Sequence, residues 1–280
     1  MIVLSQKYLI ALDLDGTLLT DDKKIATPTK LMIKHLMDLG HIVVLATGRS
    51  KRMSIFYYNE LNLVTPLINS NGAVLHHPRN KKWGIYHTPL ERKTALDIVE
   101  ASYELNSKNV LAAVQDSIYL DRYDQNIVDF YGTAKIEDGF YIGRLKEKLK
   151  ENPTLMMLYP DKKNVETLTN HLNDVHAEVI EHWNWGAPYH IIEVMNKQMN
   201  KAEALKKIAE EYHIPKERII AFGDGANDLE MIDYAGIGVA MGNAIDELKT
   251  LAKHVTDTNE KHGVANFLAN YFEIPHSIQS

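Results

Sequence analysis

The sequence contains no cysteine in its 280 residues, which excludes disulfides, thiolate metal sites and cysteine nucleophiles together. It also has no basic surplus, since 31 Lys and Arg against 37 Asp and Glu give a net charge of −6. We therefore expect neither nucleic acid nor a membrane surface as a partner. No apolar run reaches the roughly 18 residues of a membrane span, and the N-terminal segment lacks the layout of a secretory signal. These absences predict a soluble, cytoplasmic protein.

The composition, 45% apolar and 24% charged, is that of an ordinary globular protein. The length predicts one large domain or two unequal ones. Residues 8–14 and 41–46 have the continuous apolar pattern of buried strands. Between them, Thr27 and Pro28 are typical of a helix start and Gly40 of a helix end. This strand–helix–strand order predicts a parallel sheet.

The pattern changes near Trp83, where helical stretches are followed by hairpins. Residues 110–120 resemble a hairpin, and residues 178–183 and 189–195 are expected to face each other as strands. After residue 200, helices alternate again with buried strands. We therefore predict an α/β fold, with a doubly wound parallel-sheet core at residues 1–82 and 191–280. An α+β unit with an antiparallel sheet is inserted at residues 83–190.

Polar residues follow the apolar strands of the predicted core. Asp13 and Asp15 end the first strand, Thr47 and Gly48 follow the second, and a glycine-rich stretch with two aspartates and an asparagine follows the strand at 218–222. Because the carboxyl ends of parallel strands form one edge of a sheet, this edge is where a ligand is expected. Asp, Asn and Gly are also ordinary turn formers. That alternative explains Asp13 poorly, because an unpaired charge inside an apolar run is costly.

The carboxylates of this edge suggest a metal. Asp13 and Asp15 point the same way if the strand continues, and Asp224 and Asp228 are expected nearby. Such like charges need a cation between them, and oxygen ligands favour Mg²⁺ over Zn²⁺. A calcium loop would need glycine at position six and glutamate at position twelve. Those positions hold Leu18 and Lys24 counted from Asp13, and Leu229 and Ala235 counted from Asp224, so this alternative fails.

Lys201 is expected in the first turn of a helix, because Asn200 and Glu203 resemble a capping box. A cation there opposes the helix dipole by roughly 0.3–1 kcal/mol. A surface lysine tolerates this cost, but beside an acidic edge an anionic partner explains Lys201 better.

Four motifs in order resemble those of the haloacid dehalogenase-like superfamily of phosphatases. They are Asp13–Thr17 (Asp-Leu-Asp-Gly-Thr), Thr47–Arg49 (Thr-Gly-Arg), Lys201 and Gly223–Asp228 (Gly-Asp-Gly-Ala-Asn-Asp). Asn71–Ala73 and Val239–Ala244 further resemble the Cof-like branch, which has a Rossmann-like core and an α/β cap between the second and third motifs. Two departures are Ala202, where that branch commonly has glycine, and His262, where it often has an acidic residue.

The resemblance implies a Mg²⁺-dependent phosphatase in which Asp13 attacks phosphorus and forms an aspartyl phosphate. Asp15 would act as the general acid and then as the general base. Mg²⁺ would bind Asp13, the backbone carbonyl of Asp15 and Asp224. The phosphoryl oxygens would be held by the remaining motif residues, namely Leu14, Thr47, Gly48, Lys201 and Asn227. Asp228 would orient Lys201 or a metal-bound water.

The implied substrates are small phosphorylated metabolites, among them sugar phosphates, flavin mononucleotide, pyridoxal phosphate and a riboflavin-pathway intermediate. The sequence does not choose among them, nor between a monomer and a homodimer. A phosphomutase or phosphotransferase using the same aspartyl phosphate, and a non-catalytic phosphometabolite-binding module, remain alternatives. Within the insert, aromatic and histidine side chains at residues 182–190 either line the substrate side of the cap or belong to an incidental hairpin tip.

Overall fold

The computed structural model describes residues 6–131, 135–187 and 189–275, so the start of the N-terminal segment lies outside it. The chain divides into two compact units. We call residues 1–49, 54–86 and 200–280 the core unit, and residues 50–53 and 87–199 the insert unit. None of the helices in these described ranges is long and apolar enough to cross a membrane.

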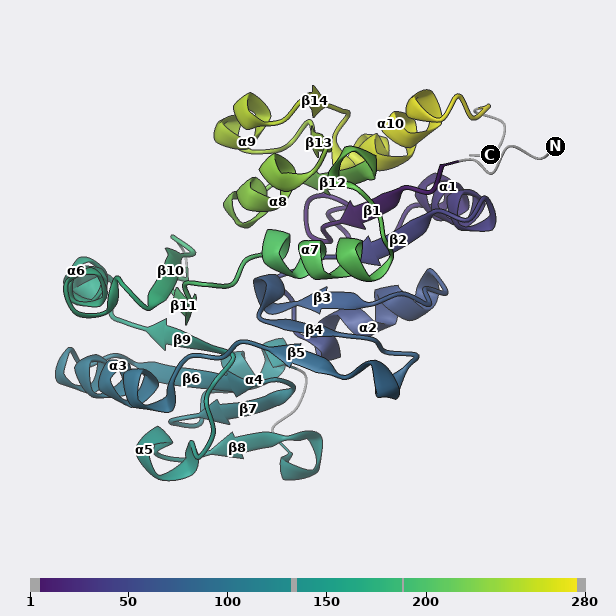
Figure 1. Cartoon of the computed structure of the whole chain (residues 1–280). Helices are drawn as coiled ribbons and strands as arrows, with labels where there is room; N and C mark the ends of the chain where they lie inside the picture. Colours follow the sequence, from purple (N-terminus) through teal and green to yellow (C-terminus); the bar gives the residue numbers. More distant parts are fainter. Residues whose placement is uncertain (1–5, 132–134, 188, 276–280) are drawn as a thin grey trace. The chain divides into compact units, whose positions relative to one another are not determined.

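The core unit is built on a five-stranded sheet whose strands are all parallel (Figure 1). Its strands, in spatial order, are β14 (His254–Val255), β13 (Ile237–Ala240), β12 (Ile219–Gly223), β1 (Leu9–Leu12) and β2 (Ile42–Leu45). Every residue of β1 is 0% exposed, so both faces of the sheet are covered at its centre. The predicted parallel core is confirmed, although its first strand ends at Leu12 rather than at Leu14.

Six helices accompany this sheet. They are α1 (Thr27–Asp38), α2 (Lys51–Glu60), α7 (Lys201–Glu211), α8 (Leu229–Tyr234), α9 (Asp246–Leu251) and α10 (Gly263–Tyr271). The N-cap of α1 is Ala26, one residue before the predicted Thr27, because the backbone of Ala26 is still extended. The N-cap of α7 is Asn200 as predicted, and its Oδ1 accepts the backbone N–H of Glu203 at 3.0 Å. Lys201 therefore lies in the first turn of α7.

A small three-stranded sheet follows α2 in the chain. It contains β3 (Leu67–Asn69), β4 (Val74–His76) and β5 (Ile85–His87). The short helix η1 (Ser70–Gly72) joins β3 to β4. The backbone N–H of Asn71 in η1 bonds to the carbonyl of Thr47 at 3.1 Å, which attaches this segment to the loop after β2.

The insert unit has its own six-stranded sheet (Figure 1). In spatial order the strands are β10 (Ile180–Asn184), β11 (Ile192–Asn196), β9 (Leu155–Tyr159), β6 (Asn109–Val114), β7 (Ser117–Leu120) and β8 (Phe140–Ile142). Neighbouring strands of this sheet pair antiparallel, as predicted, except the parallel pair β7 and β8. Its helices are α3 (Arg92–Glu104), α4 (Gln125–Tyr131), α5 (Leu145–Lys148) and α6 (Val165–His176).

Strand β11 lies beyond residue 190, where the sequence-based boundary ended the insert. It pairs with β10 on one side and β9 on the other, so its hydrogen bonds belong to the insert sheet. Residues 191–199 are therefore part of the insert unit in the structure.

Candidate active site

The candidate site lies where β1 and β12 end side by side. Leu12 of β1 is in register with Phe222 of β12, and the backbone N–H of Asp13 bonds to the Phe222 carbonyl at 3.2 Å. The same register places the loop that begins at Gly223 next to Asp13. Although β1 ends one residue earlier, Asp13 is only 5% exposed.

Lys201 is wholly buried and joins two carboxylates. Its Nζ lies 2.6 Å from Asp13 Oδ1 and 2.7 Å from Asp228 Oδ1. Burial alone would lower the pKa of Lys201, but the two carboxylates outweigh it and raise that pKa, so the ammonium stays charged. Asp228 Oδ2 accepts the backbone N–H groups of Asp224 and Gly225, each at 3.0 Å. Asp228 therefore holds Lys201 with one oxygen and shapes the loop with the other.

Three carboxylates, those of Asp13, Asp224 and Asp228, bring one oxygen each to within 4.8 Å of one another. Burial is the main cause that raises the pKa of Asp13, against the opposite effect of Lys201. Burial, with Asp228 nearby, also raises the pKa of Asp224 to about 6. Burial and mutual repulsion disfavour the ionised form of these carboxylates, and a bound cation would stabilise it.

The immediate surroundings of Asp224 also fit a cation. Thr17 Oγ1 donates to Asp224 Oδ1 at 3.0 Å and so orients the carboxylate. Gly16 has a φ of +74°, and a Cβ there would lie 2.1 Å from Asp224 Oδ2. Only glycine leaves that space open. Oxygen donors without sulfur or imidazole are those that Mg²⁺ prefers, so the residues present fit that ion.

Asp15 does not belong to this cluster. Its carboxylate accepts Arg49 Nε at 2.6 Å and Nη2 at 2.7 Å, and Lys23 Nζ at 2.9 Å. Burial raises the pKa of Asp15, but the hydrogen bonds from Arg49 and Lys23 outweigh this effect and lower the pKa to about 2. We call this arrangement the Asp15 clasp. In it the Asp15 side chain is an ionised acceptor and has no proton to give.

Asn71 lies between the loop after β2, which holds Thr47 and Gly48, and the η6 helix (Ala226–Asp228). Asn227 Nδ2 donates to Asn71 Oδ1 at 2.8 Å, and a Cβ on Gly48 would meet the same oxygen at 3.0 Å. Thr47 is 1% exposed, and its Oγ1 accepts the Arg49 backbone N–H at 3.1 Å. Leu14 is wholly buried, with its carbonyl accepting the backbone N–H groups of Thr17 and Leu19.

The structure therefore brings Asp13, Asp224, Asp228 and Lys201 into direct proximity, while the Asp15 side chain is held apart. Four residues that contact a predicted site residue had no predicted role: Thr17 contacts Asp224, Lys23 and Arg49 contact Asp15, and Asn71 contacts Asn227. Thr17, Arg49 and Asn71 lie within the motifs that were quoted, so a signal for them was present. Lys23 lies in a loop outside every motif, and no signal could have singled it out.

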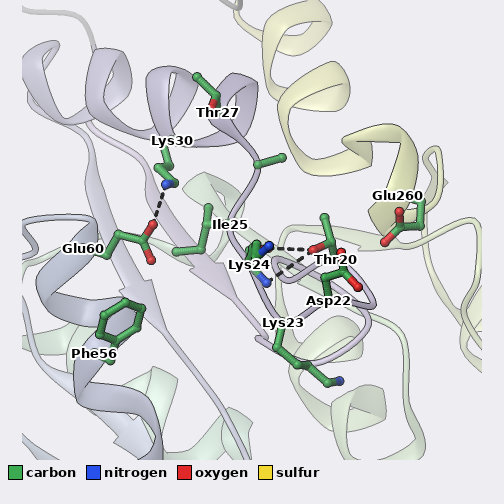
Figure 2. A pocket seen from close by; sticks show the side chains of 11 residues that line it. Thr20, Asp22, Lys23, Lys24, Ile25, Thr27, Lys30, Phe56, Glu60 and Glu260 are labelled. Carbon is green, nitrogen blue, oxygen red and sulfur yellow. Dashed lines mark hydrogen bonds and ion pairs between the residues drawn. The ribbon is translucent and has the colours of Figure 1, made fainter.

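The core unit also has a cavity of about 530 Å³ (Figure 2). Lys23 is in its wall, but Asp13, Thr47 and Lys201 are not. Lys30 in the wall is already paired with Glu60. The cavity is thus separate from Asp13, Thr47 and Lys201.

The sequence and the fold are similar to those of known proteins. A family model of haloacid dehalogenase-like hydrolases matches residues 10–268. A Bacillus subtilis protein named 5-amino-6-(5-phospho-D-ribitylamino)uracil phosphatase YitU is 46% identical over 272 residues, covering 96% of this chain and 99% of its own. A second B. subtilis phosphatase with the same substrate in its name, YcsE, is 31% identical and covers 94% of this chain and 95% of its own. The crystal structure of TM0651 from Thermotoga maritima matches with a TM-score of 0.80 and 27% identity, over 95% of this chain and 97% of that one.

Proposed function

Since the chain belongs to the haloacid dehalogenase-like hydrolases and is a phosphatase, we propose that it hydrolyses small phosphate monoesters through Asp13 with the help of Mg²⁺. The observation that supports this most is the buried contact of Lys201 with Asp13 at 2.6 Å. That contact places a permanent cation at the oxygen from which a phosphoryl group would be attacked, next to two further carboxylates.

In the proposed mechanism, Asp13 attacks phosphorus in line and the alkoxide leaves, giving an aspartyl phosphate that water then hydrolyses. Lys201, Thr47, Asn227 and the backbone N–H groups of Leu14 and Gly48 would hold the phosphoryl oxygens. Asp13, Asp224 and the backbone carbonyl of Asp15 would hold Mg²⁺, which when bound neutralises charge on the phosphate and on the carboxylates.

Asp15 would protonate the leaving alkoxide, and the clasp adds a condition to that role. A carboxyl group with a pKa near 2 is not protonated at neutral pH, so Asp15 must leave Arg49 and Lys23 before it can act as an acid. We propose that substrate binding draws these two cations away from Asp15, since a phosphate dianion is a competing partner for them.

For the substrate we propose 5-amino-6-(5-phospho-D-ribitylamino)uracil or a closely similar phosphorylated polyol. The support is the substrate named for the relative that is 46% identical and for the one that is 31% identical. We further propose that the insert unit is a cap that selects the substrate, as lids do in enzymes that must exclude water from a reactive intermediate.

The test is hydrolysis by the purified protein of a chromogenic aryl phosphate, with Mg²⁺ and with a chelator, followed by a panel of phosphorylated metabolites. Phosphate release that requires Mg²⁺ and is fastest with the ribitylaminouracil phosphate is the expected result. No release from any monoester would refute the proposed function. Isomerised rather than hydrolysed product, seen when excess sugar phosphate is added as an acceptor, would instead point to a mutase.

A further inference from the structure

One face of the insert sheet carries a buried carboxylate. Ile192 and Val194 of β11 belong to the apolar core that the sheet shares with α3 and α6. Side chains alternate along a strand, so Glu193 between them points to the opposite face. Glu193 is nevertheless only 8% exposed.

Aromatic side chains and a thioether surround this carboxylate. The indole Nε1 of Trp185 donates to Glu193 Oε2 at 3.0 Å. Met157 on β9 is in register with Glu193, and the Tyr131 and Tyr159 hydroxyls lie 3.5 Å and 3.8 Å from its Sδ. We call these five residues the Glu193 cluster.

Among the described residues, no cation is paired with Glu193. Within residues 6–131, 135–187 and 189–275, no lysine, arginine or histidine forms an ion pair with Glu193, and Trp185 is the one hydrogen-bond donor found for it. Burial raises the pKa of Glu193 to about 7, although the Trp185 hydrogen bond acts in the other direction. An apolar residue of the same size would serve packing better, because a buried carboxylate without a counter-charge destabilises a fold. A need for a hydrogen-bond acceptor therefore explains Glu193 better than packing does.

The neighbours also have unused hydrogen-bonding capacity. A thioether is a weak acceptor, so the Tyr131 and Tyr159 hydroxyls can turn to a stronger partner. Aromatic rings beside an acceptor of this kind suit a group that has both C–H surface and hydroxyl or amino donors.

We propose that the Glu193 cluster binds the organic part of the phosphate-monoester substrate, through hydroxyl or amino donors on that part. The inference rests on the proposed function and extends it, because it names the residues and the chemistry that select the leaving group. Glu193 is thus a specificity-determining residue that takes no part in breaking the P–O bond.

The test compares ribitol 5-phosphate with pentyl phosphate, which has the same chain length but lacks the other hydroxyls. Wild type is expected to prefer ribitol 5-phosphate in kcat/KM. Glu193→Leu should reduce that preference about tenfold to a hundredfold, since one hydrogen bond to a charged group is lost. The loss should lie in KM, with the pentyl phosphate rate within about twofold of wild type. Glu193→Gln, which keeps one acceptor oxygen, should lie between the two, and Glu166→Gln, an exposed glutamate on α6, is the matched control.

An unchanged preference in Glu193→Leu would overturn the inference, as would an equal loss of both esters. Titration of tryptophan fluorescence with ribitol 5-phosphate separates this inference from the proposed function. One outcome is that wild type hydrolyses neither ester and still binds ribitol 5-phosphate at least tenfold more tightly than Glu193→Leu does. That result would support the proposed role of the Glu193 cluster and refute the proposed phosphatase function. If wild type and Glu193→Leu bind ribitol 5-phosphate equally well, the proposed role of the Glu193 cluster is refuted, whatever the hydrolysis result.

Discussion

The core unit and the insert unit each bury a carboxylate, and they satisfy it by different means. Asp13 of the core unit is 5% exposed and contacts the wholly buried ammonium of Lys201 at 2.6 Å. Glu193 of the insert unit is 8% exposed and contacts a neutral indole N–H at 3.0 Å. The first carboxylate is balanced within the protein, whereas the second is left without a counter-charge among the described residues.

This difference agrees with the proposed roles of the two units. A phosphoryl-transfer site must hold its charges in one geometry throughout the reaction, so a built-in cation is an advantage there. A site that selects among leaving groups gains discrimination when its buried acceptor is satisfied only by the right ligand, because the wrong ligand leaves that acceptor unpaired. The predictions below test this contrast.

The largest expected effect is that of Asp13→Asn. Asparagine has nearly the same shape but is not a nucleophile, so turnover of an aryl phosphate should fall at least about a thousandfold while thermal unfolding stays cooperative. Asp246→Asn, an exposed aspartate at the start of α9, is the control and should keep full activity. Retained turnover in Asp13→Asn would remove the covalent mechanism, and with it the reason for a rigid charge network in the core unit.

Next in size is the effect of Lys201→Met on stability. Methionine fills a similar volume but leaves Asp13 and Asp228 buried without their cation, which should cost about 3–5 kcal/mol of unfolding free energy. Urea denaturation with and without Mg²⁺ measures it. If Mg²⁺ binds the folded state alone, as proposed, it should recover part of the loss, about 2.7 kcal/mol at a hundred times Kd. A stability equal to wild type would show that Lys201 does not offset the two carboxylates.

The sequence could predict much of the core unit because its evidence is local. Each strand is a short apolar run, and the carboxyl ends of parallel strands must meet at one edge. The proximity of Asp13, Asp224 and Asp228 therefore followed from the order of strands and helices alone. What did not follow is the Asp15 clasp. Lys23 reaches Asp15 from a loop in which its own φ is +59°, and no sequence pattern encodes that approach.

The insert unit was predicted less well, for a different physical reason. Glu193 is the one charged residue of the strand β11, and this pattern predicts a side chain that faces solvent. Its burial comes from side chains far apart in the chain, including Trp185 from the loop after β10 and Tyr131 from α4, a helix that was not predicted. The aromatic residues at 182–190 were noticed, and of these Trp185 is the one that contacts the carboxylate.

The third prediction concerns pH and Glu193. The pKa of Glu193 is raised from 4.5 in the unfolded chain to about 7 in the folded protein, so the folded state binds the proton more tightly. Its contribution to stability is therefore fully present below pH 4.5 and is lost as the pH rises through 7. Glu193→Gln should match wild type near pH 4.5 and exceed it at pH 8 by on the order of 3 kcal/mol.

Calorimetry at the two pH values measures that difference, with Glu166→Gln as the exposed control that should show none. The outcome bears directly on the contrast between the units. A gap between Glu193→Gln and wild type that stays constant with pH would mean that Glu193 titrates as an ordinary carboxyl group, and its burial would then carry no cost that needs explaining.

The smallest effect is expected for Lys23→Ala. This substitution tests whether an exposed ion pair stabilises the core unit as much as the buried pairs of Lys201 do. The Lys23 and Asp15 side chains are 55% and 43% exposed, and Arg49 still holds Asp15 through two hydrogen bonds after the substitution. An ion pair open to water contributes about 1 kcal/mol at most, so the unfolding free energy should change by less than that. Urea denaturation measures this change beside Lys34→Ala, which removes another exposed pair. A loss of unfolding free energy as large as that of Lys201→Met would mean that the Asp15 clasp belongs to the same charge network as Asp13. The distinction between the buried ion pairs and the exposed ones around them would then be wrong.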